Sequence, residues 1–215
     1  MLRNKKMSVV VTAGPTREKI DPIRFISNYS TGRFGYEIAG EAKRIGWRVT
    51  LISGPVALET PKGVKLVRVE SALEMRDAVE RRIKGADCLI MAAAVSDWRA
   101  RSPARAKIKR CRGGIILKLI ENPDIIASLA KKKGMISVGF ALETSDLEKN
   151  ALNKLRDKKL DIIVANRSTK DNSAFGDVLT SVLVIDRFGN RAVIRGRTKS
   201  CLAKIILDKI SNFNI

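Results

Sequence analysis

SVVVTAGPT, residues 8–16, is the stretch of sequence from which the fold follows. It begins with a short apolar, β-branched run, typical of a buried strand, and its Gly-Pro pair predicts a turn. Residues 35–45, GYEIAGEAKRI, have apolar side chains at helical spacing, and Gly46 ends this helix before a second strand at residues 47–54, WRVTLISG. A strand, a helix and a strand within about fifty residues predict a parallel βαβ unit.

The same alternation continues along the chain. We expect strands at residues 65–69, 86–95, 116–120, 135–143 and 160–166, and helices at 71–85, 122–134 and 148–159. Asn122 is the expected cap of the second of these helices, with Pro123 as its first residue. Residues 180–196 read as a β-hairpin that precedes a closing helix at 199–210. The sequence therefore predicts a Rossmann-like, doubly wound, mostly parallel α/β sheet with a C-terminal antiparallel hairpin.

Residues 98–114 are basic and poor in apolar side chains, so we expect a mobile loop without regular elements. A loop of this length beside a ligand edge suggests a lid, with Gly113 and Gly114 as its hinge.

Length and composition limit the classes of protein. The 215 residues, 45% of them hydrophobic, predict one domain over residues 1–215. The sequence contains no histidine and only three scattered cysteines, which argues against a zinc or thiol-redox site and excludes every histidine-based triad. No apolar run is long enough to span a membrane, so we expect a cytoplasmic protein.

The formal net charge is +20. Such a charge favours polyanions, and nucleic acid is one candidate partner. However, the basic residues are spread along the chain and no recognition motif accompanies them, which argues against nucleic acid as the partner. The other interpretations are a solvated basic surface or a field that attracts phosphorylated substrates.

Several short segments are candidate ligand-binding sites. Gly14 lies in the first βα loop, which is either a phosphate-binding loop or a tight turn. In FISNYSTGRFG, residues 25–35, hydrogen-bonding side chains and glycines precede a helix N-terminus, a place suited to an anion or a polar substrate. Asp97 follows a strand, where it is a ligand contact, a helix cap or an arginine partner. Lys154 and Lys158 share a helix face, which fits either a bound anion or plain solvation.

Taken in order, these segments resemble the phosphopantothenate–cysteine ligase family, the synthetase half of the DNA/pantothenate metabolism flavoproteins. The resemblance runs from TAGPTREKIDPIRFISNYSTGRFG (residues 12–35) through AAAVSDWR, AKIKR, ENPDI and VGFALET to IVAN (residues 163–166). A flavin-dependent decarboxylase precedes this region in bifunctional members, whereas seven residues precede it here. The resemblance therefore implies a stand-alone ligase without flavin.

The resemblance also implies roles for individual residues. Asn28 and Lys107 are the expected catalytic residues, and Lys107 also contacts the nucleotide. Together with Gly14 of the first loop, the expected nucleotide-binding residues are Met91, Ala92, Ala93, Asp97, Asn122, Pro123, Asp124, Ile125, Phe140, Lys154 and Lys158. The expected substrate-binding residues are Asn28, Ser30, Thr31 and Gly32.

The implied reaction joins phosphopantothenate to cysteine through an acyl nucleotide, with CTP and Mg²⁺, in coenzyme A biosynthesis, by a homodimer. The sequence has KIKR in place of KIKK and FALET in place of FAAET, changes that preserve charge and apolar character. FGDVLTS, residues 175–181, replaces a more acidic stretch, so ATP remains an alternative to CTP. The alternative from another class is a basic Rossmann-like nucleotide- or nucleic-acid-binding module without turnover.

Overall fold

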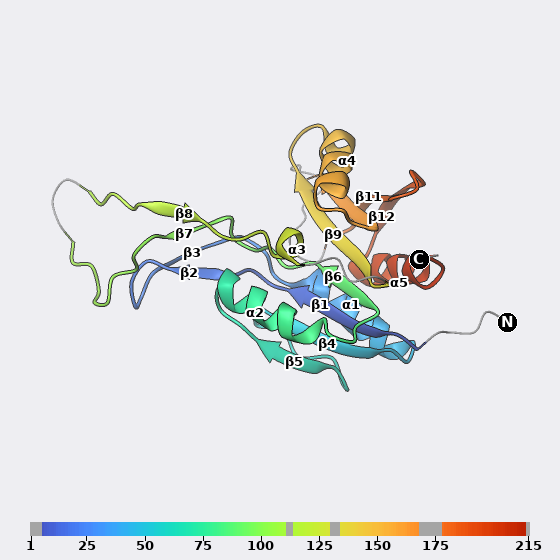
Figure 1. Ribbon diagram of the computed structural model, residues 1–215, viewed down its shortest axis with the longest axis horizontal. Helices are drawn as coiled ribbons and strands as arrows, with labels where there is room; N and C mark the ends of the chain where they lie inside the picture. The colour runs from blue at the N-terminus through green and yellow to red at the C-terminus, as the bar shows by residue number, and fades with distance from the viewer. Residues whose placement is uncertain (1–5, 111–113, 130–133, 168–177, 214–215) are drawn as a thin grey trace.

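The computed structural model describes residues 6–110, 114–129, 134–167 and 178–213, which form an α/β fold around an eight-stranded sheet (Figure 1). In spatial order the strands are β12 (Arg191–Arg197), β11 (Thr180–Asp186), β10 (Ile162–Arg167), β9 (Ile136–Glu143), β6 (Cys88–Met91), β1 (Ser8–Ala13), β4 (Arg48–Ser53) and β5 (Lys65–Arg68). In this order, the strands from β10 to β5 pair in parallel. Strand β11 pairs antiparallel with both β10 and β12. The predicted fold class is confirmed.

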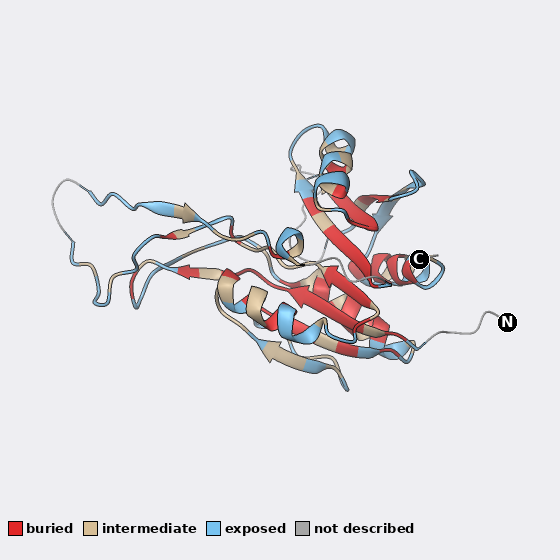
Figure 2. Cartoon of the chain, viewed as in Figure 1, coloured by how far each residue is buried: buried red, intermediate tan, exposed pale blue. Residues whose placement is uncertain are grey.

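Helices cover both faces of the sheet. Val9 and Val11 of β1 belong to the apolar cluster that contains α1 (Arg33–Arg44) and α5 (Lys199–Ser211), whereas Val10 packs with α2 (Ala72–Arg82). Helix α4 (Leu147–Asp157) packs against β9 and β10. Figure 2 shows buried residues concentrated in the inner strands of the main sheet and in α1 and α5. Burial on both faces explains why inner strands such as β1 are continuously apolar. None of the described helices is long and apolar enough to cross a membrane.

Two small sheets form an arm that extends away from the main sheet (Figure 1). In the first, β2 (Arg17–Lys19) pairs with β3 (Phe25–Ser27); in the second, β7 (Trp98–Ala100) pairs with β8 (Leu119–Glu121). We use "the arm" for residues 17–27, 98–110 and 114–121.

The arm corrects two predictions. The expectation of no regular element after residue 98 was wrong, because β7 begins there, and the strand expected at 116–120 belongs to the arm and not to the central sheet. Three-residue strands have too little periodicity to be recognised in the sequence. Gly113, one half of the expected hinge, lies outside the described residues.

The helix expected at 122–134 is also different. Helix α3 covers Ile125–Ser128, and its cap is Asp124, whose side chain accepts a hydrogen bond from Ala127 N. Asn122 was the wrong cap because its side chain is used elsewhere: it donates to Ser96 O at 2.8 Å. Residues 130–133 of the expected helix lie outside the described residues.

Gly35 allows α1 to contact β1 directly. A Cβ atom at this position would lie 2.5 Å from Ala13 Cβ and 2.9 Å from Thr12 O. Both distances are below any normal contact, so only glycine permits this spacing between the helix and the strand.

Replacing Gly35 with Ala should therefore push α1 away from β1 and destabilise the protein by about 1–3 kcal/mol, the usual effect of overpacking. Gly40→Ala on the same helix is the matched control, since its Cβ would meet Pro61 at 3.5 Å, an ordinary contact. That change should be neutral or stabilise the protein by up to about 1 kcal/mol. Urea unfolding measures both, and equal effects would contradict the packing argument.

Candidate functional site

The loops that follow β1 and β6 are joined at the carboxyl end of the sheet. Gly14 O accepts a hydrogen bond from Ala94 N at 2.9 Å, and Thr16 Oγ1 accepts one from Ser96 N at 3.0 Å. Asn28 Nδ2 donates to Ala94 O at 3.0 Å. These bonds fix the backbone where the strand order changes direction, the usual ligand position in an open α/β sheet.

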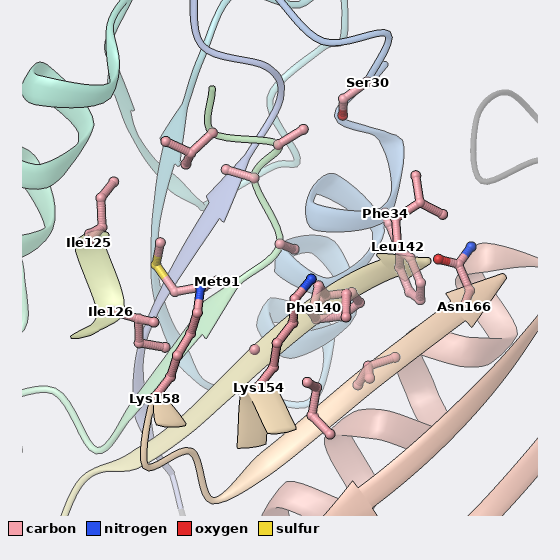
Figure 3. A pocket seen from close by; sticks show the side chains of 18 of the residues that line it. Ser30, Phe34, Met91, Ile125, Ile126, Phe140, Leu142, Lys154, Lys158 and Asn166 are labelled. Atoms are coloured by element: carbon pink, nitrogen blue, oxygen red, sulfur yellow. The ribbon is translucent and has the colours of Figure 1, made fainter. Parts of the chain in front are cut away.

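A cavity of about 370 Å³ opens beside these loops. It is lined by the start of α1, the end of β6, α3, β9 and α4 (Figure 3). The predicted residues that line it are Ser30, Thr31, Gly32, Met91, Ala92, Ala93, Asp97, Asn122, Pro123, Asp124, Ile125, Phe140, Lys154 and Lys158. The structure thus brings together most of the predicted nucleotide- and substrate-binding residues.

Gly14, Asn28 and Lys107 lie outside this lining. Gly14 and Asn28 support it indirectly, through their bonds to Ala94, which does line the cavity. Lys107 lies on the arm, where it lines a second hollow together with Arg24.

The N-terminus of α1 forms one wall of the cavity. Its cap is Gly32, with a φ of 77°, a conformation that glycine adopts without strain. Gly32 has no side chain to cap the helix, and the first-turn donor Arg33 N is hydrogen-bonded to Thr31 Oγ1 at 3.5 Å. Such a helix end favours an anion.

Lys154 and Lys158 form the opposite wall. Figure 3 shows both side chains rising from α4 into the cavity. Lys154 Nζ is 2.7 Å from Glu143 Oε1, and Lys158 Nζ is 2.7 Å from Asp124 Oδ2. Separate carboxylates therefore balance the two lysines, which removes the repulsion that their spacing suggested and holds their ammonium groups near the ligand space.

Asp124 has two functions at this wall, as the cap of α3 and as the partner of Lys158. Burial alone would raise its pKa, but the hydrogen bonds from Lys158 and from the backbone of α3 outweigh burial and hold the pKa below its ordinary value. Asp124 is therefore ionised at neutral pH.

Some lining residues were not predicted. Phe34 packs edge-on against Phe140, with ring centroids 5.1 Å apart, and Leu142, Asn166 and Lys199 also line the cavity. Lys199 is buried in the first turn of α5, although a lysine there opposes the helix dipole. A lysine directly after the Thr198 cap is unfavourable, and this was the feature of the sequence that could have marked Lys199 as a lining residue.

The described residues contain no cluster of three or more acidic or cysteine side chains that could hold a metal ion. Among the described residues, Asp97 and Asp124 are the carboxylates that line the cavity, and Asp124 is paired with Lys158.

Comparisons with known proteins give consistent matches. Residues 4–213 match the family described as DNA/pantothenate metabolism flavoprotein C-terminal domain. The chain is 42% identical over 205 residues to the coenzyme A biosynthesis bifunctional protein CoaBC of Bacillus subtilis (strain 168), covering 94% of this chain and 50% of that protein. For the CoaBC protein of Escherichia coli (strain K12) the identity is 40% over 211 residues, covering 96% and 52%. The chain spans about half the length of these curated relatives.

Among solved structures, the chain is similar to the C-terminal domain of the coenzyme A biosynthesis bifunctional protein CoaBC. The TM-score is 0.81 with 36% sequence identity, and the alignment covers 95% of this chain and 94% of the other.

If the lysine wall binds phosphate groups, Lys154→Gln or Lys158→Gln should weaken binding of inorganic tripolyphosphate about tenfold, since a charge-assisted hydrogen bond contributes about 1.5 kcal/mol. Lys149→Gln, an exposed lysine on the same helix, should change it less than about twofold. Isothermal titration calorimetry measures all three. Equal losses in the three variants would mean that only the general positive field attracts the anion.

Proposed function

The chain belongs to the family of the DNA/pantothenate metabolism flavoprotein C-terminal domain, and from this premise we propose that it is a phosphopantothenate–cysteine ligase of coenzyme A biosynthesis. The proposal assigns the activity to a single domain over residues 1–215. Its substrates are phosphopantothenate, cysteine and a nucleoside triphosphate, which we propose is CTP.

One observation carries the proposal: a single cavity combines a helix N-terminus that begins at a glycine, two oriented lysines and a strand end of small residues. The helix end and the lysines suit phosphate groups. The alanines after Met91 leave space for a ligand against the backbone, and Phe140 supplies an apolar surface. A nucleotide needs three features together: groups that bind phosphate, space against the backbone and an apolar surface.

The reaction has two steps. The carboxylate of phosphopantothenate attacks the α-phosphorus of the nucleotide and pyrophosphate leaves, giving an acyl nucleotide. The amine of cysteine then attacks the acyl carbon, an amide bond forms, and the nucleoside monophosphate leaves. Negative charge develops on the α-phosphate in the first step, so we assign Lys107 the stabilisation of that charge and Asn28 the contact with the substrate carboxyl group.

Mg²⁺ bound with the nucleotide would supply neutralisation of the charge on the pyrophosphate. Asp97, a carboxylate of the cavity lining, would be its protein ligand.

We also propose a homodimer assembled through the arm. The arm exposes large apolar side chains, among them Ile23, Phe25, Trp98, Ile116, Leu117 and Leu119. Neighbouring exposed apolar residues are typical of an interaction surface. The partner that covers these side chains is a second copy of the chain, because Lys107 on the arm lines a different hollow from the proposed nucleotide cavity of its own chain. Sedimentation velocity tests this, and a monomer at micromolar concentration would contradict it.

The function is tested by incubating the protein with CTP, phosphopantothenate, cysteine and Mg²⁺. Pyrophosphate should be released only when phosphopantothenate is present, and phosphopantothenoylcysteine should form only when cysteine is added. Parallel reactions with ATP establish the nucleotide preference. Tight, salt-sensitive DNA binding without any turnover would instead favour the nucleic-acid-binding alternative.

The Asn28→Asp variant provides the site control for this assay. It places a negative charge beside the substrate carboxylate and the Ala94 carbonyl while hardly changing the side-chain size, so the rate should fall about a hundredfold or more. Asn28→Ser, which adds no charge, should be less impaired. Both should melt only slightly below the wild type, because Asn28 is exposed and its amide makes a single hydrogen bond, to Ala94 O. A near-normal kcat/KM for Asn28→Asp would remove Asn28 from the site.

A further inference from the structure

Asp21 is a buried carboxylate within the exposed arm. Its side chain has no exposed surface. Oδ1 accepts hydrogen bonds from Ile23 N at 2.9 Å and Arg24 N at 2.8 Å, and Oδ2 accepts from Arg24 Nε at 3.0 Å and Nη2 at 2.6 Å. The hydrogen bonds from the Arg24 guanidinium hold the pKa of Asp21 well below its usual range, against the burial that would raise it.

The carboxylate also reaches across the arm to a distant part of the sequence. Ile108 N donates to Asp21 Oδ2 at 3.1 Å, and Ile108 O accepts from Arg24 Nη2 at 2.7 Å. Ala104 N donates to Ile20 O at 2.9 Å, which adds a backbone bond between the same two segments. Both polar backbone groups of Ile108 are therefore held by one ion pair of the β2–β3 turn.

We propose that Asp21 is a positioning residue, whose carboxylate, together with Arg24, fixes the backbone at Ile108 and so sets the position of the neighbouring Lys107. This inference rests on the proposed function, because it gives Lys107 a charge-stabilising role. Asp21 itself touches neither substrate nor nucleotide.

The charges around the hollow support this role. Arg24, Lys107, Lys109 and Arg110 all line it. Like charges repel one another, and the buried carboxylate paired with Arg24 offsets part of that repulsion. Without Asp21 the segment would lose the hydrogen bond at Ile108 N, and Arg24, which holds Ile108 O, would lose its ion-pair partner.

The test uses Asp21→Asn, which keeps the shape but replaces one acceptor oxygen with an amide donor that faces N–H groups. Glu41→Gln is the matched control: Glu41 is also a largely buried carboxylate bonded twice by an arginine three residues on, Arg44, but it lies on α1, outside the arm. Arg24→Lys is the milder second variant in case Asp21→Asn folds poorly. The measurements are hydrogen exchange of the peptide containing Ile108 and pyrophosphate release under the conditions of the ligase assay.

We expect exchange at Ile108 to be at least about tenfold faster in Asp21→Asn and unchanged in Glu41→Gln. Pyrophosphate release should slow about tenfold or more in Asp21→Asn with the nucleotide affinity unchanged. Adding Asp21→Asn to Lys107→Gln should cause little further loss, because a positioning residue has no effect once the group that it positions is removed. Unchanged protection of Ile108, or losses that multiply in the double variant, would overturn the inference. If the wild type releases no pyrophosphate with CTP or ATP, the proposed function fails, whereas the exchange comparison still decides whether Asp21 holds this segment.

Discussion

The close backbone approach at the carboxyl end of β1 is the constraint on which the rest of the structure depends. Gly35 rests on Ala13, and a Cβ on Gly32 would lie only 3.2 Å from the Cα of Gly14. This contact fixes where α1 begins, and the start of α1 forms a wall of the cavity. Because the loop after β6 is bonded to the loop after β1, the same contact also determines the position of the carboxyl end of β6.

The lysines of the site fall into two sets, one in the walls of the cavity and one on the arm. The cavity walls carry charges that are already balanced, since Lys154 and Lys158 each have a carboxylate partner. A phosphate that enters can therefore share lysines that are held in place, and little side-chain entropy is lost on binding. The arm carries Lys107 on a different support, held by Asp21 and Arg24. In the proposed function, binding and charge stabilisation would thus depend on two different parts of the chain.

The sequence predicted the central sheet well, because long apolar strands and amphipathic helices have clear periods. It failed at the arm, where β2 and β7 are three residues long and draw their stability from distant partners. Most residues of the cavity were predicted through the resemblance to the family, whereas the residue pattern alone pointed to the end of the strand at Met91 and to the segment before α1. Lys199 was not predicted, because only the complete sheet order brings the start of α5 to this cavity. The support that Asp21 gives to Ile108 depends on a contact between residues 87 positions apart, which no local pattern reveals.

The two edges of the central sheet show where part of the positive charge lies. Edge strand β12 exposes Arg191, Arg195 and Arg197, and edge strand β5 exposes Lys65 and Arg68. Unpaired strand edges are templates for aggregation, and charged side chains along them oppose the addition of another strand. The basic composition therefore protects the protein against fibrillar self-association at both edges. This protection weakens as salt shortens the Debye length, which is about 10 Å at 0.1 M.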